Sequence, residues 1–197
     1  PGGLTWLYDA TVSLRDIMKE LGIGVDGGKD SLSLAAQALD QDGNTVLVRS
    51  PGTLVLSTYA ACSDTTKAIT PDIKRPGESK LAFIDLAHGQ TRLGGSALSQ
   101  VLNQIGLVCP DVEFPQTLVT VGNLMNRFLS EGILLSAQFR TRGGLIQALN
   151  DMAFAGNCGY DISLAHPSAT EAERFFNEEV GLILGYLPEN EAKIKEA

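Results

Sequence analysis

From residue 81 onward, apolar segments of two different periods alternate along the chain, and this alternation constrains the fold more than any other feature. Residues 81–86 and 181–187 are short apolar runs typical of buried strands. Residues 94–105, 116–129 and 143–155 carry apolar side chains at three- and four-residue steps, which is typical of amphipathic helices. Interleaved strands and helices predict a layered α/β or α+β fold.

Two further elements are expected in the same part of the chain. Residues 160–164 are interpreted as a strand, and residues 168–171 (Ser-Ala-Thr-Glu) have the pattern of a capping box that opens a fourth helix. Gly132 and Gly156 are expected to end the second and third helices.

The first part of the chain has its own pattern. Residues 7–21 place apolar side chains at helical spacing, and Gly22 is expected to cap the end of that helix. An Asp-Gly pair at residues 42–43 predicts a hairpin, with strands at residues 45–49 and 53–62. Residues 63–80 are polar and rich in Pro and Gly, so we interpret them as a linker between domains.

Charge and composition exclude several classes of partner. The 15 Lys and Arg residues against 23 Asp and Glu give a net charge of −8, so neither nucleic acid nor an anionic membrane surface is an expected partner. No apolar run reaches the ~18 residues of a membrane-spanning helix, and no signal peptide is visible. We therefore expect a cytoplasmic protein and, because the chain opens with Pro1, a fragment of a longer one.

Cysteine and histidine offer no metal site or catalytic triad. The three cysteines stand far apart, and neither His88 nor His166 has a neighbouring nucleophile or a zinc-ligand spacing. The cysteines are expected to be buried thiols in a reducing compartment: Cys62, Cys109 and Cys158.

The strongest local signal is a glycine-rich loop at residues 27–31. Paired glycines let the backbone approach an anion closely, and a lysine and a serine add charge and a hydroxyl donor. The loop lacks the Walker A spacing, and the same pattern is also that of an ordinary surface turn. The candidate ligand contacts are Gly27, Gly28, Lys29, Asp30 and Ser31.

Two weaker signals each leave two interpretations open. Arg92 and the Gly94–Gly95 pair precede a predicted helix, where they favour either anion binding or close packing of a strand and a helix. Glu178 and Glu179 are either a carboxylate pair for acid–base or metal chemistry or the solvated end of a helix.

Five stretches of the chain together resemble one enzyme family, the phosphoribosylformylglycinamidine synthases of the large single-chain type. The resemblance is collinear over nearly all 197 residues. The stretches are residues 24–33, 54–60, 93–98, 152–159 (Met-Ala-Phe-Ala-Gly-Asn-Cys-Gly) and 176–179 (Phe-Asn-Glu-Glu).

The resemblance implies an ATP-dependent C–N ligase of de novo purine biosynthesis. In this family, ATP phosphorylates the formyl-amide oxygen of formylglycinamide ribonucleotide, and ammonia released from glutamine displaces the phosphate to give formylglycinamidine ribonucleotide. ATP and Mg²⁺ are then the expected cofactors of the parent protein. The other synthetase and glutaminase domains are the expected partners, and the chain alone is expected to be inactive.

The resemblance also implies a domain plan and a fold. Residues 1–72 correspond to the C-terminal part of a ferredoxin-like synthetase domain that contributes to a central barrel. Residues 73–197 correspond to an outer α/β domain of the aminoimidazole-ribonucleotide-synthetase-like type.

The carried-over site departs from the family at one place. Residues 27–31 match the family's loop that faces nucleotide and substrate, which favours Lys29 and Ser31 as ligand contacts. Before Gly143–Gly144, however, the family reads His-Asp-x-Ser-Asp, whose first Asp resembles a magnesium ligand; this chain has Gln-Phe-Arg-Thr-Arg at residues 138–142. Only Thr141 keeps its hydroxyl as a nucleotide contact, and an aromatic ring cannot bind Mg²⁺.

This departure keeps a second hypothesis open. A relative that has lost nucleotide binding would retain the fold as a scaffold or interaction module, and the residues at 138–142 favour that alternative. The intact loop at residues 27–31 favours the enzyme.

Overall fold

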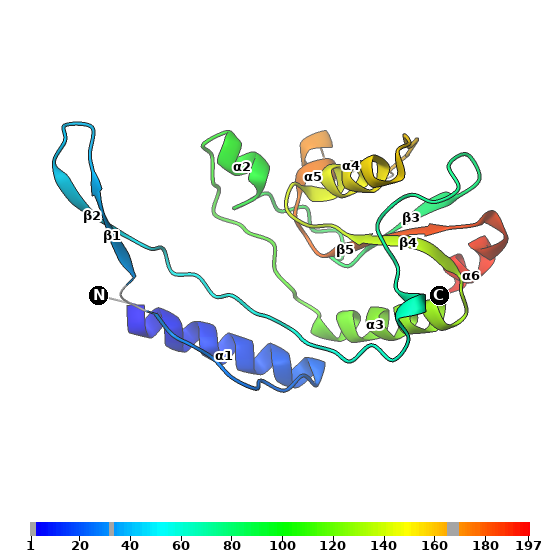
Figure 1. Cartoon of the computed structure of the whole chain (residues 1–197), viewed down its shortest axis with the longest axis horizontal. Coiled ribbons are helices and arrows are strands. Elements are labelled where there is room, and N and C mark those ends of the chain that lie inside the picture. Colours follow the sequence, from blue (N-terminus) through cyan, green and yellow to red (C-terminus); the bar gives the residue numbers. More distant parts are fainter. Residues whose placement is uncertain (1–2, 32–33, 165–169) are drawn as a thin grey trace. The chain divides into compact units, whose positions relative to one another are not determined.

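The computed structural model describes residues 3–31, 34–164 and 170–197 (Figure 1). The chain divides into two compact units, Pro1–Cys62 and Ser63–Ala197. Among the described helices, none is both long enough and apolar enough to cross a membrane.

The first unit contains one helix and one hairpin. Helix α1 (Gly3–Leu21) is followed by an irregular segment, and strands β1 (Ala35–Leu39) and β2 (Thr45–Arg49) pair in antiparallel register. The turn between them is fixed by Asp40, whose carboxylate accepts hydrogen bonds from the backbone of Asp42 at 3.0 Å and of Asn44 at 2.8 Å. These bonds, the one to Asn44 first, lower the pKa of Asp40. The predicted helix, the hairpin and the strand expected at residues 45–49 are confirmed.

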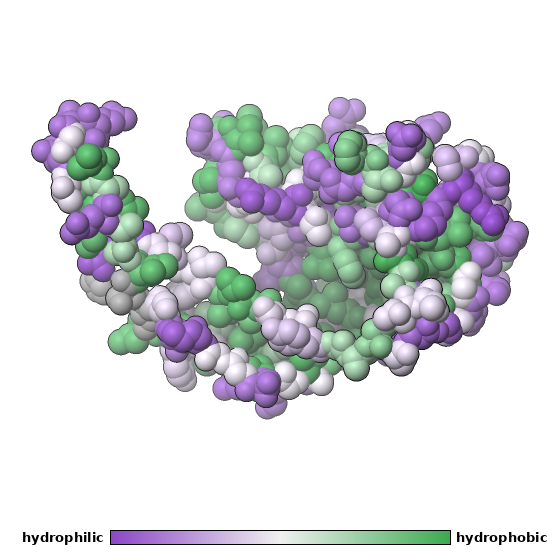
Figure 2. Space-filling model, viewed as in Figure 1, coloured by the Kyte–Doolittle hydropathy of each residue, from purple (hydrophilic) through white to green (hydrophobic). Residues whose placement is uncertain are grey.

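No described residue of the first unit is buried. Apolar side chains stand exposed on both strands of the hairpin: Leu39, Val46, Leu47 and Val48. Figure 2 shows green, hydrophobic surface among purple, hydrophilic surface on the hairpin. Because none of its described residues is buried, this unit has little core of its own. An isolated two-stranded hairpin is only marginally stable in water.

The second unit is built around a three-stranded antiparallel sheet. Its strands are β3 (Lys80–Asp85), β4 (Leu134–Phe139) and β5 (Gly181–Tyr186), in the spatial order β3-β5-β4. The last strand in sequence therefore lies in the centre of the sheet, and all six of its residues are buried.

Helices cover both faces of this sheet (Figure 1). Helices α4 (Gly144–Gly156) and α5 (Glu171–Phe176) lie on one face, and α3 (Pro115–Ser130) and α6 (Glu191–Glu196) on the other. The short helix α2 (Ala97–Val101) follows β3, and two 3₁₀ turns, Thr65–Lys67 and Pro188–Asn190, complete the unit.

Alternation along β5 separates the core into two layers. Ile183 packs with α4, whereas Leu182 and Leu184 pack with α3, because successive side chains of a strand point to opposite faces. The layer beneath α4 includes Leu145, Leu149 and Met152, and the layer beneath α3 includes Leu124, Met125 and Phe128. The result is a three-layer α/β arrangement, as the interleaved pattern predicts.

Three predicted elements of the two units are wrong. The helix expected at residues 94–105 is only α2, because Asn103 (φ 54°) and Gly106 (φ 76°) leave helical geometry and turn the chain back. Residues 53–62 and 160–164, expected as strands, are irregular and pair with no other described strand. Tyr160, Ile162 and Leu164 nevertheless pack against the core beneath α4.

Other predictions differ from the structure only in detail. Helices α3 and α4 and strands β3 and β5 are confirmed, whereas β1 and β4 were not expected. The capping box is formed by Thr170 and Glu173. The box expected at 168–171 begins at residues outside the described part of the chain.

Residues 63–80, interpreted as a linker, form part of the second unit. Ile69 packs in the layer beneath α3 and Ile73 in the layer beneath α4, and the backbone N–H of Ile73 donates to Met152 at 3.1 Å. Apolar residues within a polar stretch thus bind this segment to the sheet.

Gly144 provides a test of the turn that begins α4. Its φ of +76° is unfavourable for residues with a Cβ, and a Cβ there would lie 2.5 Å from the carbonyl oxygen of Phe175. We expect Gly144→Ala to lower the free energy of unfolding by about 2 kcal/mol or more, measured by urea denaturation with far-UV circular dichroism.

The matched control is Gly122→Ala, at an exposed position of α3 where a Cβ would meet open space. Removing a helical glycine there is expected to stabilise the chain by about 0.5–1 kcal/mol. Equal stability of the Gly144 variant and the unsubstituted chain would contradict the described turn.

Candidate functional site

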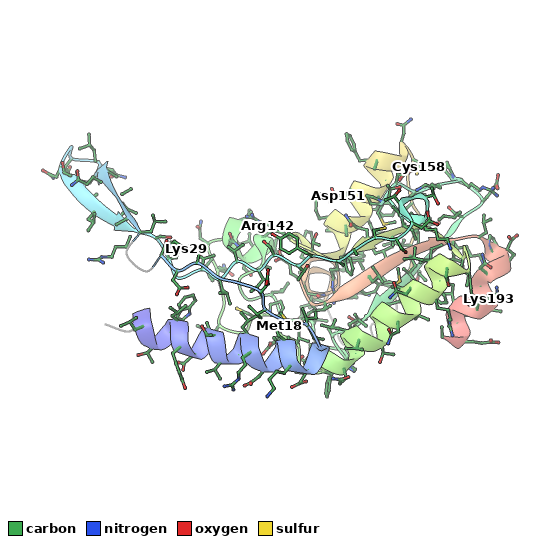
Figure 3. All side chains as sticks on the ribbon, turned by 60° about the horizontal axis from the view of Figure 1, so that its bottom comes forward. Met18, Lys29, Arg142, Asp151, Cys158 and Lys193 are labelled. Carbon is green, nitrogen blue, oxygen red and sulfur yellow. The ribbon has the colours of Figure 1, made fainter. Side chains whose placement is uncertain are left out.

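The loop at residues 27–31 lies in the first unit and is exposed throughout. The Lys29 ammonium (labelled in Figure 3) donates to the Ser31 hydroxyl at 3.2 Å and to the carbonyl of Asp30. Neither Gly27 nor Gly28 has a positive φ, and a Cβ at either would meet open space. The structure therefore brings the predicted lysine and serine together as a paired donor group on an open loop.

Thr141 lies in the second unit, in the tight turn between β4 and α4. Its carbonyl accepts from the N–H of Gly144 at 2.9 Å, and its side chain is exposed. Phe139 and Arg142 on either side are exposed too, Phe139 by 62% (Arg142 is labelled in Figure 3). This turn thus presents one hydroxyl, one aromatic ring and one guanidinium to solvent.

Arg140, in the middle of the same stretch, points inward. Its guanidinium donates to a carboxylate oxygen of Asp85 at 3.0 Å and to the carbonyls of Glu179 and Val180, and it lies 5.0 Å from the centre of the Phe83 ring. Burial lowers the pKa of Arg140, and the Asp85 charge opposes that shift. The side chain ties the adjoining ends of β3, β4 and β5 together.

The residues at 138–142 do not fit a magnesium site. Magnesium prefers hard oxygen ligands such as carboxylates, and the exposed side chains of this turn are a phenyl ring, one hydroxyl and one guanidinium instead. The nearby carboxylate of Asp85 is already paired with Arg140. Across residues 3–31, 34–164 and 170–197, no group of three or more His, Cys, Asp and Glu side chains is placed to hold a metal.

Residues 177–179 form the segment between α5 and β5 and join several parts of the second unit. The Asn177 amide donates to the carbonyl of Glu173, and its oxygen accepts from the N–H of Glu179 at 3.2 Å. A single carboxylate oxygen of Glu178 accepts from the N–H of Ala97 at 2.7 Å and of Gly143 at 2.8 Å. These contacts connect the segment to α5, α2 and α4.

Glu179 is fully buried and paired with Arg92. The two carboxylate oxygens accept from the Arg92 guanidinium at 2.5 and 2.8 Å, and one of them also accepts from the Arg92 N–H at 3.1 Å. Glu113 binds the outer edge of the same guanidinium. Hydrogen bonds to Glu179 and then Glu113 raise the pKa of Arg92, and the bond from Arg92 lowers the pKa of Glu113.

These contacts test the interpretations of the two weaker sequence signals, the Glu178–Glu179 pair and the Arg92 and Gly94–Gly95 turn. Glu178 and Glu179 point to different partners and do not form a metal-binding pair, and Glu179 is not at a solvated helix end. Arg92 is occupied by two carboxylates, and a Cβ at Gly94 would lie 2.3 Å from the carbonyl oxygen of Val108. The turn before α2 is therefore built for close packing.

The cysteine prediction is wrong for two of the three residues. Cys62 and Cys109 are exposed, and Cys158 is half-buried and packs against the core beneath α4. His88 has a positive φ of 50°, and its ring meets Phe114 edge-on at 4.5 Å between centroids.

A groove of about 560 Å³ runs beside β3, between that strand, α4 and residues 159–164. Its floor is apolar and includes Phe83 and Leu145. At its rim, Glu191 pairs with Lys195 at 2.7 Å and Lys80 at 2.5 Å, which lowers the pKa of Glu191 to about 2. The charges at this rim are thus already paired with one another.

Sequence reasoning missed Asp85, Arg140 and Glu113 as parts of these networks. The residues that they pair with lie 21 to 55 positions away in the sequence, so no local pattern reveals the pairing. The departure from the family at residues 138–142 marks this turn as unusual. It does not indicate that the Arg140 side chain points into the core.

Two protein families match successive parts of the chain. Residues 1–61 match the family described as FGAR-AT PurM_N-like domain, and residues 86–197 match the family described as AIR synthase related protein, C-terminal domain.

Curated relatives agree with these matches. A probable phosphoribosylformylglycinamidine synthase, chloroplastic/mitochondrial, of Arabidopsis thaliana is 45% identical over 179 residues, covering 90% of this chain and 12% of the relative. The phosphoribosylformylglycinamidine synthase of Homo sapiens is 42% identical over 185 residues, covering 93% of this chain and 14% of the relative. The chain therefore spans only about an eighth of the length of these proteins.

Solved structures show a similar fold. Thermotoga maritima PurL complexed with ATP aligns with a TM-score of 0.55 at 15% identity, over 92% of this chain and 27% of that one. The match of residues 86–197 covers more than half of the sequence, so the chain belongs to the AIR synthase related proteins, and its relatives among them are phosphoribosylformylglycinamidine synthases.

Proposed function

We propose that this chain is part of a phosphoribosylformylglycinamidine synthase, an ATP-dependent ligase of purine biosynthesis. The parent protein would convert formylglycinamide ribonucleotide, glutamine, ATP and water to formylglycinamidine ribonucleotide, glutamate, ADP and phosphate. The observation that carries the proposal is the identity of 42–45% to synthases over at least 90% of this chain. The chain's share of the work would be to hold nucleotide and substrate.

The proposal includes a domain assignment. Residues 1–72 would be the C-terminal part of a ferredoxin-like domain that contributes to a barrel, and residues 73–197 the outer α/β domain. The order of the two family matches, residues 1–61 and then 86–197, supports this assignment. The exposed apolar side chains of β1 and β2 also support it, because further strands would cover them.

The loop at residues 27–31 would supply the phosphate contacts in the first unit. Lys29 and Ser31 lie 3.2 Å apart on an exposed loop, so one phosphate oxygen can accept from both without rearrangement of the backbone. A charged donor beside a phosphate forms a hydrogen bond stronger than a neutral one. Gly27, Gly28 and Asp30 would contribute backbone around the same ligand.

Thr141 would contact nucleotide from the second unit through its exposed hydroxyl. ATP would supply the phosphoryl group that activates the amide oxygen of the substrate. Because the residues at 138–142 do not fit Mg²⁺, we assign no step at this turn to a metal.

A kinetic assay of the complete parent protein tests the proposal. With formylglycinamide ribonucleotide, ATP and either glutamine or ammonia, we expect formylglycinamidine ribonucleotide to form, and Lys29→Ala to weaken nucleotide or substrate use. Loss of one charge-assisted phosphate contact is worth about 1.5–3 kcal/mol, which corresponds to roughly tenfold or more in KM.

Lys19→Ala, on the exposed side of α1 in the same unit, is the matched control and should leave KM unchanged. Product formation with unchanged kinetics for Lys29→Ala would show that the loop is only a surface turn. A parent protein without any product would contradict the proposed function itself.

The residues at 138–142 favour one rival function, a non-catalytic scaffold that keeps the fold. In such a protein the nucleotide site of the outer domain would be lost, and association with other proteins would be the retained role. Phe139 and Arg142 support this rival, because an exposed phenyl ring and an exposed guanidinium stand where the family has two carboxylates.

Restoring the family residues separates the two functions. We expect the fourfold variant Gln138→His, Phe139→Asp, Thr141→Ser and Arg142→Asp of the parent protein to gain Mg²⁺-dependent ADP binding, because two carboxylates then provide oxygen ligands. Titration calorimetry with ADP, with and without Mg²⁺, measures the gain on both forms. Equal affinity before and after restoration would show that this turn does not hold the nucleotide's metal.

A further inference from the structure

Glu178 lies where two glycine-containing turns of the second unit meet. One of its carboxylate oxygens accepts from Ala97, the first residue of α2, and from Gly143, which directly precedes α4. The first N–H groups of a helix have no partner within the helix, so an outside acceptor must satisfy them. One atom of Glu178 thus serves two helix starts that are separated by 46 residues in sequence (143 − 97).

The neighbours of Glu178 hold it in place from both sides. Asn177 is buried and bonded to Glu173 of α5, and Glu179 is buried and paired with Arg92. The Glu178 side chain itself is half-exposed. Because the segment is fixed on both sides of Glu178, its carboxylate has little freedom to move. The position of the carboxylate therefore determines where the two N–H groups lie.

We propose that Glu178 is a positioning residue that ties the turn at residues 93–96 to the turn at residues 141–144 and thereby sets where Thr141 lies. The Thr141 carbonyl accepts from the N–H of Gly144, and the residue before Gly144, Gly143, donates to Glu178. Because Gly143 lies within this hydrogen-bonded turn, a shift of Gly143 moves Thr141 with it. The link between the turns stands on this geometry alone. Its importance for catalysis rests on the proposed function, in which Thr141 contacts nucleotide.

We expect the link between the two turns to depend on both the acceptor oxygen and the length of the side chain at position 178. Glutamine keeps an oxygen that can accept from both N–H groups, whereas alanine removes the acceptor and aspartate is one methylene too short to reach both. Glu178→Gln is therefore the conservative variant, and Glu178→Asp tests the geometry with the charge retained. Glu171→Ala, exposed in the first turn of α5, is the matched control.

The first measurement is amide hydrogen exchange by NMR on the chain of 197 residues. We expect the amides of Ala97 and Gly143 to exchange faster together in Glu178→Ala, at least one of them to do so in Glu178→Asp, and neither to change in Glu171→Ala. Glu178→Gln should keep both protected. Unchanged exchange at both amides in Glu178→Ala and Glu178→Asp would overturn the link; if Glu178→Ala does not fold, the Asp and Gln variants decide the matter.

The second measurement is steady-state kinetics of the complete parent protein with ATP as the varied substrate. Misplacement of a ligand contact by about 1 Å costs up to a hundredfold in rate. We expect kcat/KM for ATP to fall in Glu178→Asp and to be restored in Glu178→Gln. Normal kinetics in the Asp variant alongside fast amide exchange would contradict the catalytic importance of the link. An unsubstituted parent protein without activity would contradict the proposed function but leave the exchange result standing.

Discussion

The buried ion pair between Arg92 and Glu179 is the interaction on which the second unit depends most. A carboxylate with no exposed surface is very unfavourable unless it is paired and fully hydrogen-bonded, and Arg92 provides both conditions with its side chain and its backbone N–H. The pair connects the loop after β3 to Glu179, two residues before the central strand β5. It therefore fixes the start of β5 relative to the loop after β3.

Other contacts follow from that position of Glu179. Its carbonyl and that of Val180 accept from Arg140, which brings the end of β4 to the start of β5. Its neighbour Glu178 accepts from the N–H of Ala97, the first residue of α2, and of Gly143, the residue before α4. The 177–179 segment thus holds together the two turns that the sequence marks with paired glycines, and Gly144 is required because it packs directly on the backbone of Phe175 and Phe176.

The sequence predicted those elements whose stability is local or whose apolar pattern is simple. Periodicity located α1, α3 and α4, and apolar runs located β3 and β5. It failed for α2, where positive φ at Asn103 ends the helix early, and for residues 160–164, which pack on the core without pairing. Strand β4 was missed because its buried Ser136 and half-buried Gln138 interrupt the apolar pattern.

The candidate site was only partly predictable for a related reason. Lys29 and Ser31 are two residues apart, so the local motif was enough to predict that both belong to one loop, and the structure adds the hydrogen bond between them. The Arg92–Glu179 pair spans 87 residues, and nothing near either residue indicates that Glu179 is buried. The same holds for Arg140: the sequence shows that residues 138–142 depart from the family, but only the fold shows that this arginine points inward.

A double-mutant cycle between Arg92 and Glu179 tests the central claim most directly. The free energy of unfolding of the chain would be measured by urea denaturation for Arg92→Gln, Glu179→Gln and the double variant. If this pair organises the unit, the two effects are strongly non-additive, with a coupling energy on the order of 2–3 kcal/mol. Additivity within about 0.5 kcal/mol would contradict the claim, because it would mean that Glu179 is stabilised by something other than Arg92.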